Sequence, residues 1–379
     1  MRQDRPFPDS PADLLRRGAP EGPVLCFCPA VLRETAQTFL DGFPGEVTYA
    51  VKANPEPAVL ENLAAAGIGA FDVASPAEID LVRTVAPGAG LHYNNPVRSG
   101  AEIARAVAAG VRAFSLDSAG ELFRLAARVP AGAELSVRFK LPVKGAAYDF
   151  GAKFGAEPAA AAALLRAVAA AGYAPALTFH PGTQCAPPEV WRAYVTKAAA
   201  IARAAGVEIA RLNVGGGFPA HRLAAEPPRL APIFAAIDGA AAEVFGAARP
   251  ALLCEPGRGL VAESCTLLTR IRALRDDHVF LDDGIYGGLA EMLSLPMTDR
   301  IEVRAPDGAR RAGPSVPRTV FGPTCDSLDR LPGEPALPVD AAEGDAVLFH
   351  GMGAYSGATA TRFNGFGALT VATVSRLAE

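Results

Sequence analysis

The chain lacks a long hydrophobic run, because no uninterrupted apolar stretch of its 379 residues reaches the ~18 residues that a membrane-spanning helix needs. It also has no block of Lys or Arg, and its formal net charge is −4. The sequence therefore carries no electrostatic footprint for nucleic acid or an anionic membrane. The polar first residues are not followed by an apolar segment of signal-peptide form. We expect a cytoplasmic protein with neither kind of partner.

Cysteine is scarce and scattered, with six in the chain. Cys26 and Cys28 form a Cys-x-Cys pair, which has the wrong spacing for a zinc site, and no second pair or histidine cluster accompanies it. We therefore predict no metal site. In a cytoplasmic chain the thiols are expected to be reduced and mostly buried as core filler. Cys325 is the expected exception.

A Gly-x-Gly-x-x-Gly motif is missing after the first strand, which disfavours a doubly wound sheet of the dinucleotide-binding kind. From residue 47 onward, apolar strand-like segments alternate with helical segments rich in Ala, Leu, Arg and Glu. The expected strands are residues 47–51, 69–73, 90–94, 113–117, 134–140, 176–180, 211–215 and 251–255. Eight such units predict a (β/α)₈ TIM-type barrel, in which chemistry gathers at the carboxyl ends of the strands.

The pattern changes near residue 260, where helical spacing fades and short β-type runs begin. These runs are residues 265–272, 278–281, 301–303, 318–321, 346–349 and 369–374. We predict a barrel at residues 30–260 and a C-terminal all-β domain at residues 261–379. Residues 1–29 are predicted to form an arm and a strand that joins the β-domain. Residues 304–318 are polar and proline-rich, and are expected to form a mobile loop.

Polar side chains stand at the expected strand ends, where a barrel does not need them for stability. They are Lys52, Asp72, Asn94, Asp117, Arg138, His180 and Glu255. Gathered at one mouth, they would form a site. Two interpretations of Lys52 compete: an edge lysine that reaches to water, or a lysine neutralised as a Schiff base with a cofactor. Nothing local decides between them.

Two glycine-rich runs follow the last two expected strands. Gly215, Gly216 and Gly217 leave backbone N–H groups bare, as a phosphate site requires. Gly257 and Arg258 offer a second bare segment with a guanidinium that suits phosphate. Either run alone would be read as an ordinary tight turn. Both runs lie at the ends of the last two expected strands, which is where barrels tend to hold phosphate groups. This shared location favours a phosphate site.

Seven motifs occur in a fixed order along the chain. They are VTYAVKANP at 47–55, FDVAS at 71–75, FHPGTQC at 179–185, GGGFP at 215–219, EPGR at 255–258, GPTCD at 322–326, and Tyr355 followed by NGF at 364–366. In this order they resemble the pyridoxal-phosphate-dependent ornithine/lysine/diaminopimelate decarboxylase family, which has the alanine-racemase-like fold. The resemblance runs from about residue 24 to the end. The stretch 283–291 looks most like the bacterial ornithine decarboxylase branch.

The resemblance implies roles for the strand-end residues. Lys52 would be the Schiff-base lysine of pyridoxal 5'-phosphate (PLP), His180 would stack on the ring, and Glu255 would lie beside the pyridine nitrogen. The remaining cofactor residues it implies are Asp72, Arg138, Thr183, Gly215, Gly216, Gly217, Gly257, Arg258 and Tyr355. Alanine racemases have the same fold, but they are alike in having an arginine at the position that corresponds to Glu255. Since a carboxylate makes the ring a better electron sink, Glu255 favours decarboxylation over racemisation.

The same resemblance implies a substrate site. Cys325 would be the general acid that the partner subunit supplies, although a lone thiol is more often a buried structural cysteine. Asp326 would meet the distal ammonium of ornithine or lysine, because the diaminopimelate branch typically has Cys-Glu-Ser and this chain has Cys-Asp-Ser. Tyr286, Glu291 and Tyr355 are further substrate contacts. The animal-type enzymes carry an acidic residue that residues 294–297 lack, and Glu291 is the candidate replacement.

We therefore expect a homodimeric decarboxylase with shared active sites, converting L-ornithine to putrescine in polyamine biosynthesis, with lysine as a second substrate. Arginine, diaminopimelate, carboxynorspermidine and D-amino acids stay open as substrates. A racemase of the same fold is the alternative that Glu255 opposes. A non-catalytic regulator would be expected to lose cofactor residues such as Lys52 and His180, and both are present.

Overall fold

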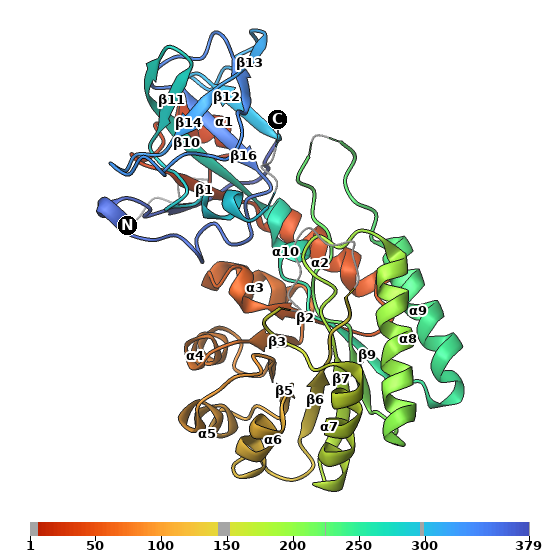
Figure 1. Ribbon diagram of the computed structural model, residues 1–379. Coiled ribbons are helices and arrows are strands. Elements are labelled where there is room, and N and C mark those ends of the chain that lie inside the picture. Colours follow the sequence, from red (N-terminus) through yellow and green to blue (C-terminus); the bar gives the residue numbers. More distant parts are fainter. Residues whose placement is uncertain (1–6, 143–151, 224, 296–298, 379) are drawn as a thin grey trace. The chain divides into compact units, whose positions relative to one another are not determined.

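The computed structural model describes residues 7–142, 152–223, 225–295 and 299–378, and it divides into two compact units (Figure 1). The barrel unit comprises Ala36–Pro219 and Pro228–Gly259. The β unit comprises Met1–Thr35, Ala220–Pro227 and Leu260–Glu379. The division near residue 260 matches the change of pattern in the sequence. The short segment Ala220–Pro227 lies in the β unit, whereas the sequence placed it in the barrel.

Eight parallel strands close the barrel in chain order. They are β2 (Glu46–Ala50), β3 (Ala70–Val73), β4 (Gly90–Tyr93), β5 (Ala113–Leu116), β6 (Glu134–Arg138), β7 (Ala174–Thr178), β8 (Arg211–Asn213) and β9 (Ala251–Cys254). Strand β2 pairs with β3 on one side and with β9 on the other, which closes the ring. The predicted (β/α)₈ barrel is confirmed.

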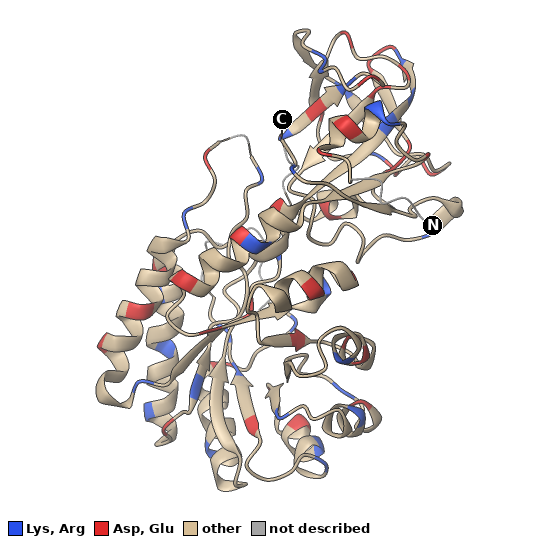
Figure 2. Ribbon diagram, turned by 180° about the vertical axis from the view of Figure 1, so that it is seen from behind, with Lys and Arg blue, Asp and Glu red and all other residues tan. Residues whose placement is uncertain are grey.

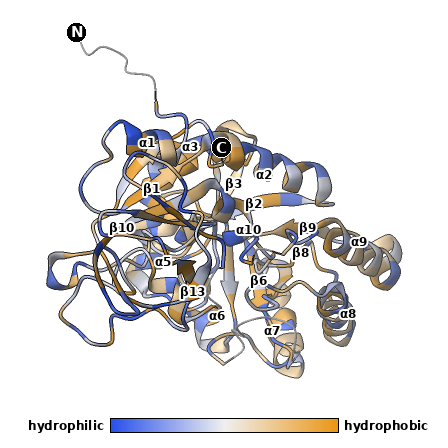
Figure 3. Cartoon of the chain, turned by 90° about the horizontal axis from the view of Figure 1, so that it is seen from above, coloured by the Kyte–Doolittle hydropathy of each residue, from blue (hydrophilic) through white to orange (hydrophobic). Residues whose placement is uncertain are grey.

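Helices alternate with these strands along the chain and lie around them (Figure 1). They are α3 (Pro57–Ala65), α4 (Pro76–Val85), α5 (Gly100–Ala108), α6 (Ala119–Ala126), α7 (Pro158–Ala170), α8 (Pro188–Ala205) and α9 (Ala231–Phe245), while α2 (Pro29–Gly42) precedes β2. Ser75, Ser99 and Ser118 cap α4, α5 and α6, because each side chain accepts a backbone N–H from the first helical turn. Figure 3 shows hydrophobic and hydrophilic residues on the same helices, as expected of helices with one face packed on a barrel.

Ion pairs join the amino ends of three barrel strands. The guanidinium of Arg211 on β8 lies 2.8 Å from Glu46 on β2 and 3.1 Å from Glu134 on β6. These pairs stand at the end of the barrel opposite the carboxyl ends of the strands, the end associated with stability. Elsewhere on the barrel unit the two signs of charge are interspersed along the helices (Figure 2).

One segment, Ala231–Ala248, is long and apolar enough to cross a membrane by length and composition, with a mean hydropathy of 1.3. It consists of α9 and the short turn η2 (Gly246–Ala248). Ile233, Phe234 and Ile237 are buried. Glu243 pairs with Arg192 of α8 at 2.9 Å. These contacts are those of an outer barrel helix packed by one face.

The β unit is built on one main sheet with strand order β12-β16-β10-β1-β17, in which β11 also pairs with β10 and β14 pairs with β11. Its strands are β1 (Val24–Phe27), β10 (Cys265–Arg275), β11 (His278–Leu281), β12 (Ile301–Arg304), β14 (Thr319–Phe321), β16 (Ala346–His350) and β17 (Thr370–Thr373). Every β-type run expected from the sequence appears in this sheet. A separate pair, β13 (Ser315–Pro317) with β15 (Ala336–Pro338), was not predicted. Strand β13 lies inside the segment expected to be a mobile loop.

The N-terminal strand β1 is central to this sheet. It pairs antiparallel with β10 and parallel with β17, so that Val24 lies opposite both Leu268 and Thr370. Val24 and Leu268 are buried together with Leu14 from α1 (Pro11–Arg16) and Leu348 from β16. The N-terminal segment therefore completes the sheet and core of the C-terminal unit.

Asp283, which follows β11, is a buried carboxyl that makes stability depend on pH. Burial raises its pKa from 3.8 to about 7, although the backbone N–H of Gly288 donates to its Oδ2 at 2.9 Å. Between these pH values the unfolded chain loses the proton and the folded chain keeps it, so stability falls as pH rises from 4 to 7. Asp283→Asn should therefore stabilise the protein by roughly 2–4 kcal/mol above pH 7 and have little effect below pH 4. Denaturant unfolding of both proteins at pH 5 and pH 8 tests this, and an equal effect at both pH values would contradict it.

Candidate active site

The carboxyl ends of the barrel strands bring several of the predicted residues together. Lys52 lies in the turn η1 (Val51–Ala53) directly after β2, and its side chain is exposed. Its ammonium acts electrostatically on Asp72 of β3, on His180 after β7 and on Glu255 after β9. Since such interactions weaken with distance, the four side chains share one mouth of the barrel. Both interpretations of Lys52 agree with its exposure, and its neighbours favour a functional role.

Glu255 is held by two asparagine side chains. The amide groups of Asn94, which follows β4, and Asn213, the last residue of β8, both donate to Glu255 Oε1. Asn213 is fixed in turn, because its Oδ1 accepts the backbone N–H of Gly215 at 2.8 Å. The sequence placed Asn94 at a strand end without a role, and it did not predict Asn213. The available signal for Asn213 was an amide ending an apolar strand just before three glycines.

The charge of Glu255 depends on its surroundings. Burial and the negative charge of Asp72 raise its pKa to about 8, while the Asn213 amide, Lys52 and Arg138 act in the opposite direction. A further positively charged N–H donor beside this carboxyl would lower its pKa and keep it ionised at neutral pH. The two asparagines hold Oε1, so Oε2 is the oxygen that such a donor would meet.

Asp72 is a second buried carboxyl in this mouth. Burial raises its pKa to about 6, against the opposing effects of Lys52, Asn94 and Arg138. Its Oδ1 is buried and accepts no hydrogen bond from any residue that the structure describes. Because buried acceptors are normally satisfied, an acceptor left open in this place is typical of a site that a ligand completes.

His180 presents a neutral imidazole. Burial lowers its pKa well below the usual value, and the positive charges of Arg138 and Lys52 act in the same direction. The backbone N–H of Gly182 donates to its Nδ1 at 3.1 Å, which assigns the ring proton to Nε2. Arg138 itself lies at the end of β6, with its guanidinium 5.4 Å from the ring centre of Phe154.

The glycine run forms a close-packed backbone cradle beside His180. A Cβ on Gly215 would lie 2.1 Å from the Phe179 carbonyl oxygen, and one on Gly216 would lie 2.6 Å from the Glu255 carbonyl oxygen. Gly217, at φ +92°, would place a Cβ 2.1 Å from the Gly182 carbonyl oxygen. No larger residue fits without backbone movement. The Gly215 N–H already donates to Asn213, so the amides of Gly216 and Gly217 are the ones that suit an anion.

Two further segments border the cradle. The loop that carries Thr183 is tied to it, because the backbone N–H of Cys185 donates to the Gly217 carbonyl at 2.9 Å. Gly257 packs against the turn that bears Lys52, where its Cβ would lie 2.9 Å from that of Ala53. Arg258 is buried at the start of the short helix α10 (Arg258–Val261). The loop of Thr183 is thus joined to the glycine run, and the segment of Gly257 and Arg258 lies against the turn of Lys52.

The predicted substrate residues Cys325 and Asp326 lie in the β unit. The Cys325 thiol is exposed, and Asn364 Oδ1 accepts both its S–H at 3.2 Å and its backbone N–H at 3.1 Å. Asp326 accepts the Tyr286 hydroxyl at 2.6 Å and the Leu328 backbone N–H at 2.9 Å. These bonds lower the pKa of Asp326, which is therefore ionised at neutral pH.

Asp329 holds this segment in place, and the sequence did not predict it. Its buried carboxylate accepts the backbone N–H of Ile285 at 3.0 Å and both the N–H and the hydroxyl of Thr324, at 3.1 and 2.8 Å. One side chain thereby joins the turn that leads to Tyr286 with the turn that leads to Cys325.

Two other predicted residues have surroundings that the sequence did not anticipate. Glu291, in the 3₁₀ turn η4 (Ala290–Leu293), is buried and pairs with Arg222 at 3.3 Å within the β unit. This ion pair gives Glu291 a partner within the protein that the sequence did not predict, and its role as a substrate contact stays a prediction. Tyr355 is half-buried and adopts a left-handed backbone, at φ 62°. Of the segment expected to lack an acidic residue, 294–297, the last two residues lie outside the described part of the chain.

Comparison with known proteins identifies the family to which the chain belongs. Residues 30–262 match the family of pyridoxal-dependent decarboxylases, over its pyridoxal binding domain. The chain belongs to the pyridoxal-dependent decarboxylases. It is 32% identical to a lysine/ornithine decarboxylase of Selenomonas ruminantium over 330 residues, which cover 84% of this chain and 81% of the relative. It is 33% identical to the ornithine decarboxylase of Mus musculus over 351 residues, covering 84% and 73%.

Solved structures of pyridoxal-dependent decarboxylases agree with this assignment. A lysine decarboxylase structure from Selenomonas ruminantium covers 96% of this chain and 94% of its own, with a TM-score of 0.82 and 30% identity. A lysine/ornithine decarboxylase from Vibrio vulnificus, solved with putrescine, covers 96% of both chains, with a TM-score of 0.79 and 27% identity. A variant of SrLDC, at 29% identity and a TM-score of 0.85, was solved in complex with PLP.

The barrel mouth of this decarboxylase fits its cofactor, pyridoxal 5'-phosphate. The amides of Gly216 and Gly217 and the Arg258 guanidinium suit the phosphate, and Lys52 would supply an amine for the aldehyde carbon. The neutral His180 ring suits the face of the pyridine, and Glu255 Oε2 suits its protonated nitrogen. The open acceptor of Asp72 adds a place for a further donor. When bound, the cofactor supplies a ring that accepts the electron pair released as the substrate loses CO₂.

The glycine cradle makes a testable contribution to cofactor affinity in this decarboxylase. Gly216→Ala should weaken PLP binding at least ~10-fold, because the added methyl group would overlap the Glu255 backbone and lie 3.4 Å from His180 Nε2. Gly239→Ala on α9 is the matched control, since its methyl group would meet nothing closer than 3.9 Å. Fluorescence titration of the apoprotein with PLP measures both, and equal affinities would contradict the assigned cradle.

Proposed function

We propose that this decarboxylase acts on a basic amino acid, L-ornithine first and L-lysine second, and forms putrescine or cadaverine. The observation that carries the proposal is the ionised carboxylate of Asp326, held next to Cys325 by Tyr286 and Leu328. A fixed anion of this kind complements the distal ammonium of a diamino acid. The names of the relatives from Selenomonas ruminantium and Mus musculus, lysine/ornithine and ornithine decarboxylase, support the same substrates.

In the proposed reaction the chain's own residues divide the work. Lys52 binds the cofactor before substrate arrives and accepts or returns protons at its amine. Glu255, oriented by its two asparagines, keeps a negative charge beside the ring nitrogen. Cys325 donates a proton to the α-carbon after CO₂ has left, and Asn364, which accepts its S–H, sets the direction of the thiol. Asp326 fixes the far end of the substrate.

We further propose that two copies of the chain share their active sites, so that the partner subunit supplies Cys325 and Asp326. Large apolar side chains surround these residues within the β unit: Leu328 is 71% exposed and Phe363 is 43% exposed. The Phe363 ring lies 4.9 Å from that of Tyr286, next to Asp326. Exposed apolar groups beside predicted catalytic residues support a surface that another copy covers. All six cysteines are free, which supports a location in the reducing cytoplasm.

The substrate proposal is tested by CO₂ release from the PLP-loaded protein. The panel is L-ornithine, L-lysine, L-arginine, meso-diaminopimelate, carboxynorspermidine and the D-isomers of the first three. We expect L-ornithine to give the highest kcat/KM, and Asp326→Asn to raise its KM ~10–100-fold, as for loss of one charge-assisted contact. Asp340→Asn, in the same unit, is the control. Preference for meso-diaminopimelate, or an unchanged KM in Asp326→Asn, would refute the assigned role of Asp326.

A further inference from the structure

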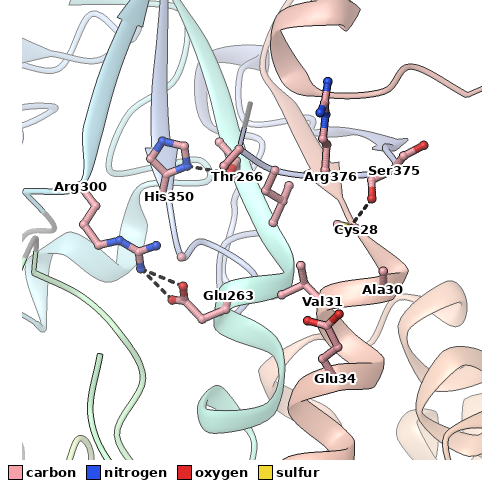
Figure 4. Close-up of a pocket in the computed structure, with 13 residues that line it drawn as sticks. Cys28, Ala30, Val31, Glu34, Glu263, Thr266, Arg300, His350, Ser375 and Arg376 are labelled. Carbon is pink, nitrogen blue, oxygen red and sulfur yellow. Dashed lines mark hydrogen bonds and ion pairs between the residues drawn. The ribbon is translucent and has the colours of Figure 1, made fainter. Parts of the chain in front are cut away.

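A cavity of about 420 Å³ lies within the β unit, and several of its polar side chains contact one another (Figure 4). Both Glu263 oxygens accept from Arg300 Nη1, at 2.8 and 2.9 Å. His350 Nδ1 lies 3.0 Å from the Thr266 hydroxyl. None of these four residues is assigned to cofactor or substrate. In the barrel unit, by contrast, a buried arginine makes contacts that lead to the active site.

That arginine is Arg98, which lies between β4 and α5 and whose side chain is 0% exposed. All three of its guanidinium nitrogens donate hydrogen bonds. Nε donates to Glu121 Oε1 at 2.9 Å, Nη1 to the Tyr93 carbonyl at 2.8 Å, and Nη2 to the Ser115 carbonyl. Tyr93 is the last residue of β4, Ser115 belongs to β5, and Glu121 belongs to α6. One side chain therefore joins two neighbouring barrel strands to a helix.

Glu121 has a second cationic partner, so its neutralisation alone does not explain Arg98. Its Oε2 accepts from Arg124 Nε and Nη2, at 2.9 and 2.6 Å, and the Arg124 side chain is 44% exposed. Burial lowers the pKa of Arg98, while Glu121 and Tyr93 raise it and Arg124 lowers it. A buried guanidinium is costly unless each of its donors is satisfied. Here two of the three nitrogens are satisfied by strand carbonyls, which indicates a role at the strand ends.

The carbonyl of Tyr93 and the N–H of Asn94 belong to the same peptide group. This N–H and the Asn94 side chain both lower the pKa of Asp72 by hydrogen bonding. The Asn94 side chain also donates to Glu255 Oε1. A cation bound to a peptide carbonyl fixes the peptide plane and strengthens its N–H as a donor. One peptide group therefore connects Arg98 to both buried carboxyls of the barrel mouth.

We propose that Arg98 is a positioning residue of the active site, which sets the place of Asn94 and, through it, the hydrogen bonds of Asp72 and Glu255. It acts through the Tyr93–Asn94 peptide, since its own nitrogens are used by Glu121 and the two carbonyls. Lys52 and Arg138 are the charged groups that act on Asp72 directly. The inference rests on the cofactor site assigned to the barrel mouth, and it does not depend on which amino acid is decarboxylated.

A double-mutant cycle of Arg98→Lys and Asn94→Ala tests the proposal in the PLP-loaded protein. An ammonium is a point charge and cannot meet three acceptors spread around a planar fork, so the lysine should stay with Glu121 and release the Tyr93 carbonyl. Each single variant should shift the pH dependence of the visible absorbance in the same direction, and the double variant should shift it no further than Asn94→Ala. Arg98→Lys should lower kcat ~3–10-fold and Asn94→Ala ~10-fold, as for one hydrogen bond. The double variant should lose no more than Asn94→Ala alone.

Arg124→Gln is the matched control, because it removes the outer partner of Glu121 and leaves the Tyr93 carbonyl bound; it should change neither absorbance nor kcat. Arg98→Gln replaces Arg98→Lys if a buried ammonium prevents folding, since it is neutral and Arg124 still pairs with Glu121. A wild-type absorbance profile in the Arg98 variant would show a purely structural role and overturn the proposal. So would additive effects in the double variant, or an equal shift in Arg124→Gln. The absorbance readout needs no turnover, so a wild-type protein that binds PLP but releases no CO₂ would contradict the proposed decarboxylation alone.

Discussion

Replacing Lys52 with alanine is expected to lower CO₂ release ~10³-fold or more and to remove the visible absorbance that the lysine-bound cofactor gives. The side chain has two functions in the barrel mouth. In the proposed function it would supply the amine that holds the cofactor, and its positive charge lowers the pKa values of Asp72 and Glu255. Without it both buried carboxyls would hold their protons to higher pH. Absorbance spectra and CO₂ assays of the PLP-loaded variant measure the two effects.

Lys197→Ala, on the outer helix α8, is the control and should leave activity and spectrum unchanged. If Lys52→Ala retained turnover, the role assigned to Lys52 in holding the cofactor would be wrong. The same variant also tests the shared active site, because mixing it with Cys325→Ala should restore about a quarter of the wild-type sites in random hybrid dimers. No recovery on mixing would show that each chain builds its site alone.

Glu255→Gln is expected to lower kcat roughly a hundredfold or more, with a smaller change in KM. Glutamine keeps the shape of the side chain and an oxygen for the Asn94 and Asn213 amides. It loses the negative charge that would stabilise a protonated ring nitrogen. The visible spectrum of the bound cofactor should therefore change its pH dependence, and this readout does not rely on turnover.

Asn213→Ala separates charge from positioning at this site. It keeps the Glu255 carboxyl and removes one of its two donors, so we expect a loss of about tenfold in kcat, in line with one hydrogen bond. Asn213→Asp, which removes the donor and adds a like charge, should be worse than alanine. Glu61→Gln, on the exposed side of α3, should have no effect. A Glu255→Gln variant with wild-type kcat and spectrum would contradict the proposed role of the carboxylate.

The barrel was predictable because its signal is local and repeated. Several of the apolar strands are followed within a few residues by a Ser or Pro that starts a helix, as at Ser75 and Ser118, and eight repeats leave few alternatives to a closed parallel barrel. The chemistry was predictable for the same reason. Once the strands are parallel, side chains directly after them, such as Lys52 and His180, must gather at one end.

The residues that the sequence did not reveal act through contacts between distant parts of the chain. Asn213 reaches Glu255 across 42 positions, and Asn364 reaches Cys325 across 39. The pairing of Glu291 with Arg222 spans 69 positions, and nothing in the sequence indicated it. Periodicity carries no information about such pairs, because it reports which face of an element is buried and not what meets it.

The most direct test of the account is to incubate the PLP-loaded protein with L-ornithine in D₂O and to measure both CO₂ and the products by mass spectrometry. The account predicts one CO₂ for each putrescine formed and one deuterium on the carbon that lost the carboxylate, delivered by the exchanged Cys325 thiol. Deuterium appearing at the α-carbon of unreacted ornithine without CO₂ would show racemase chemistry and would contradict the roles assigned to Glu255 and Cys325.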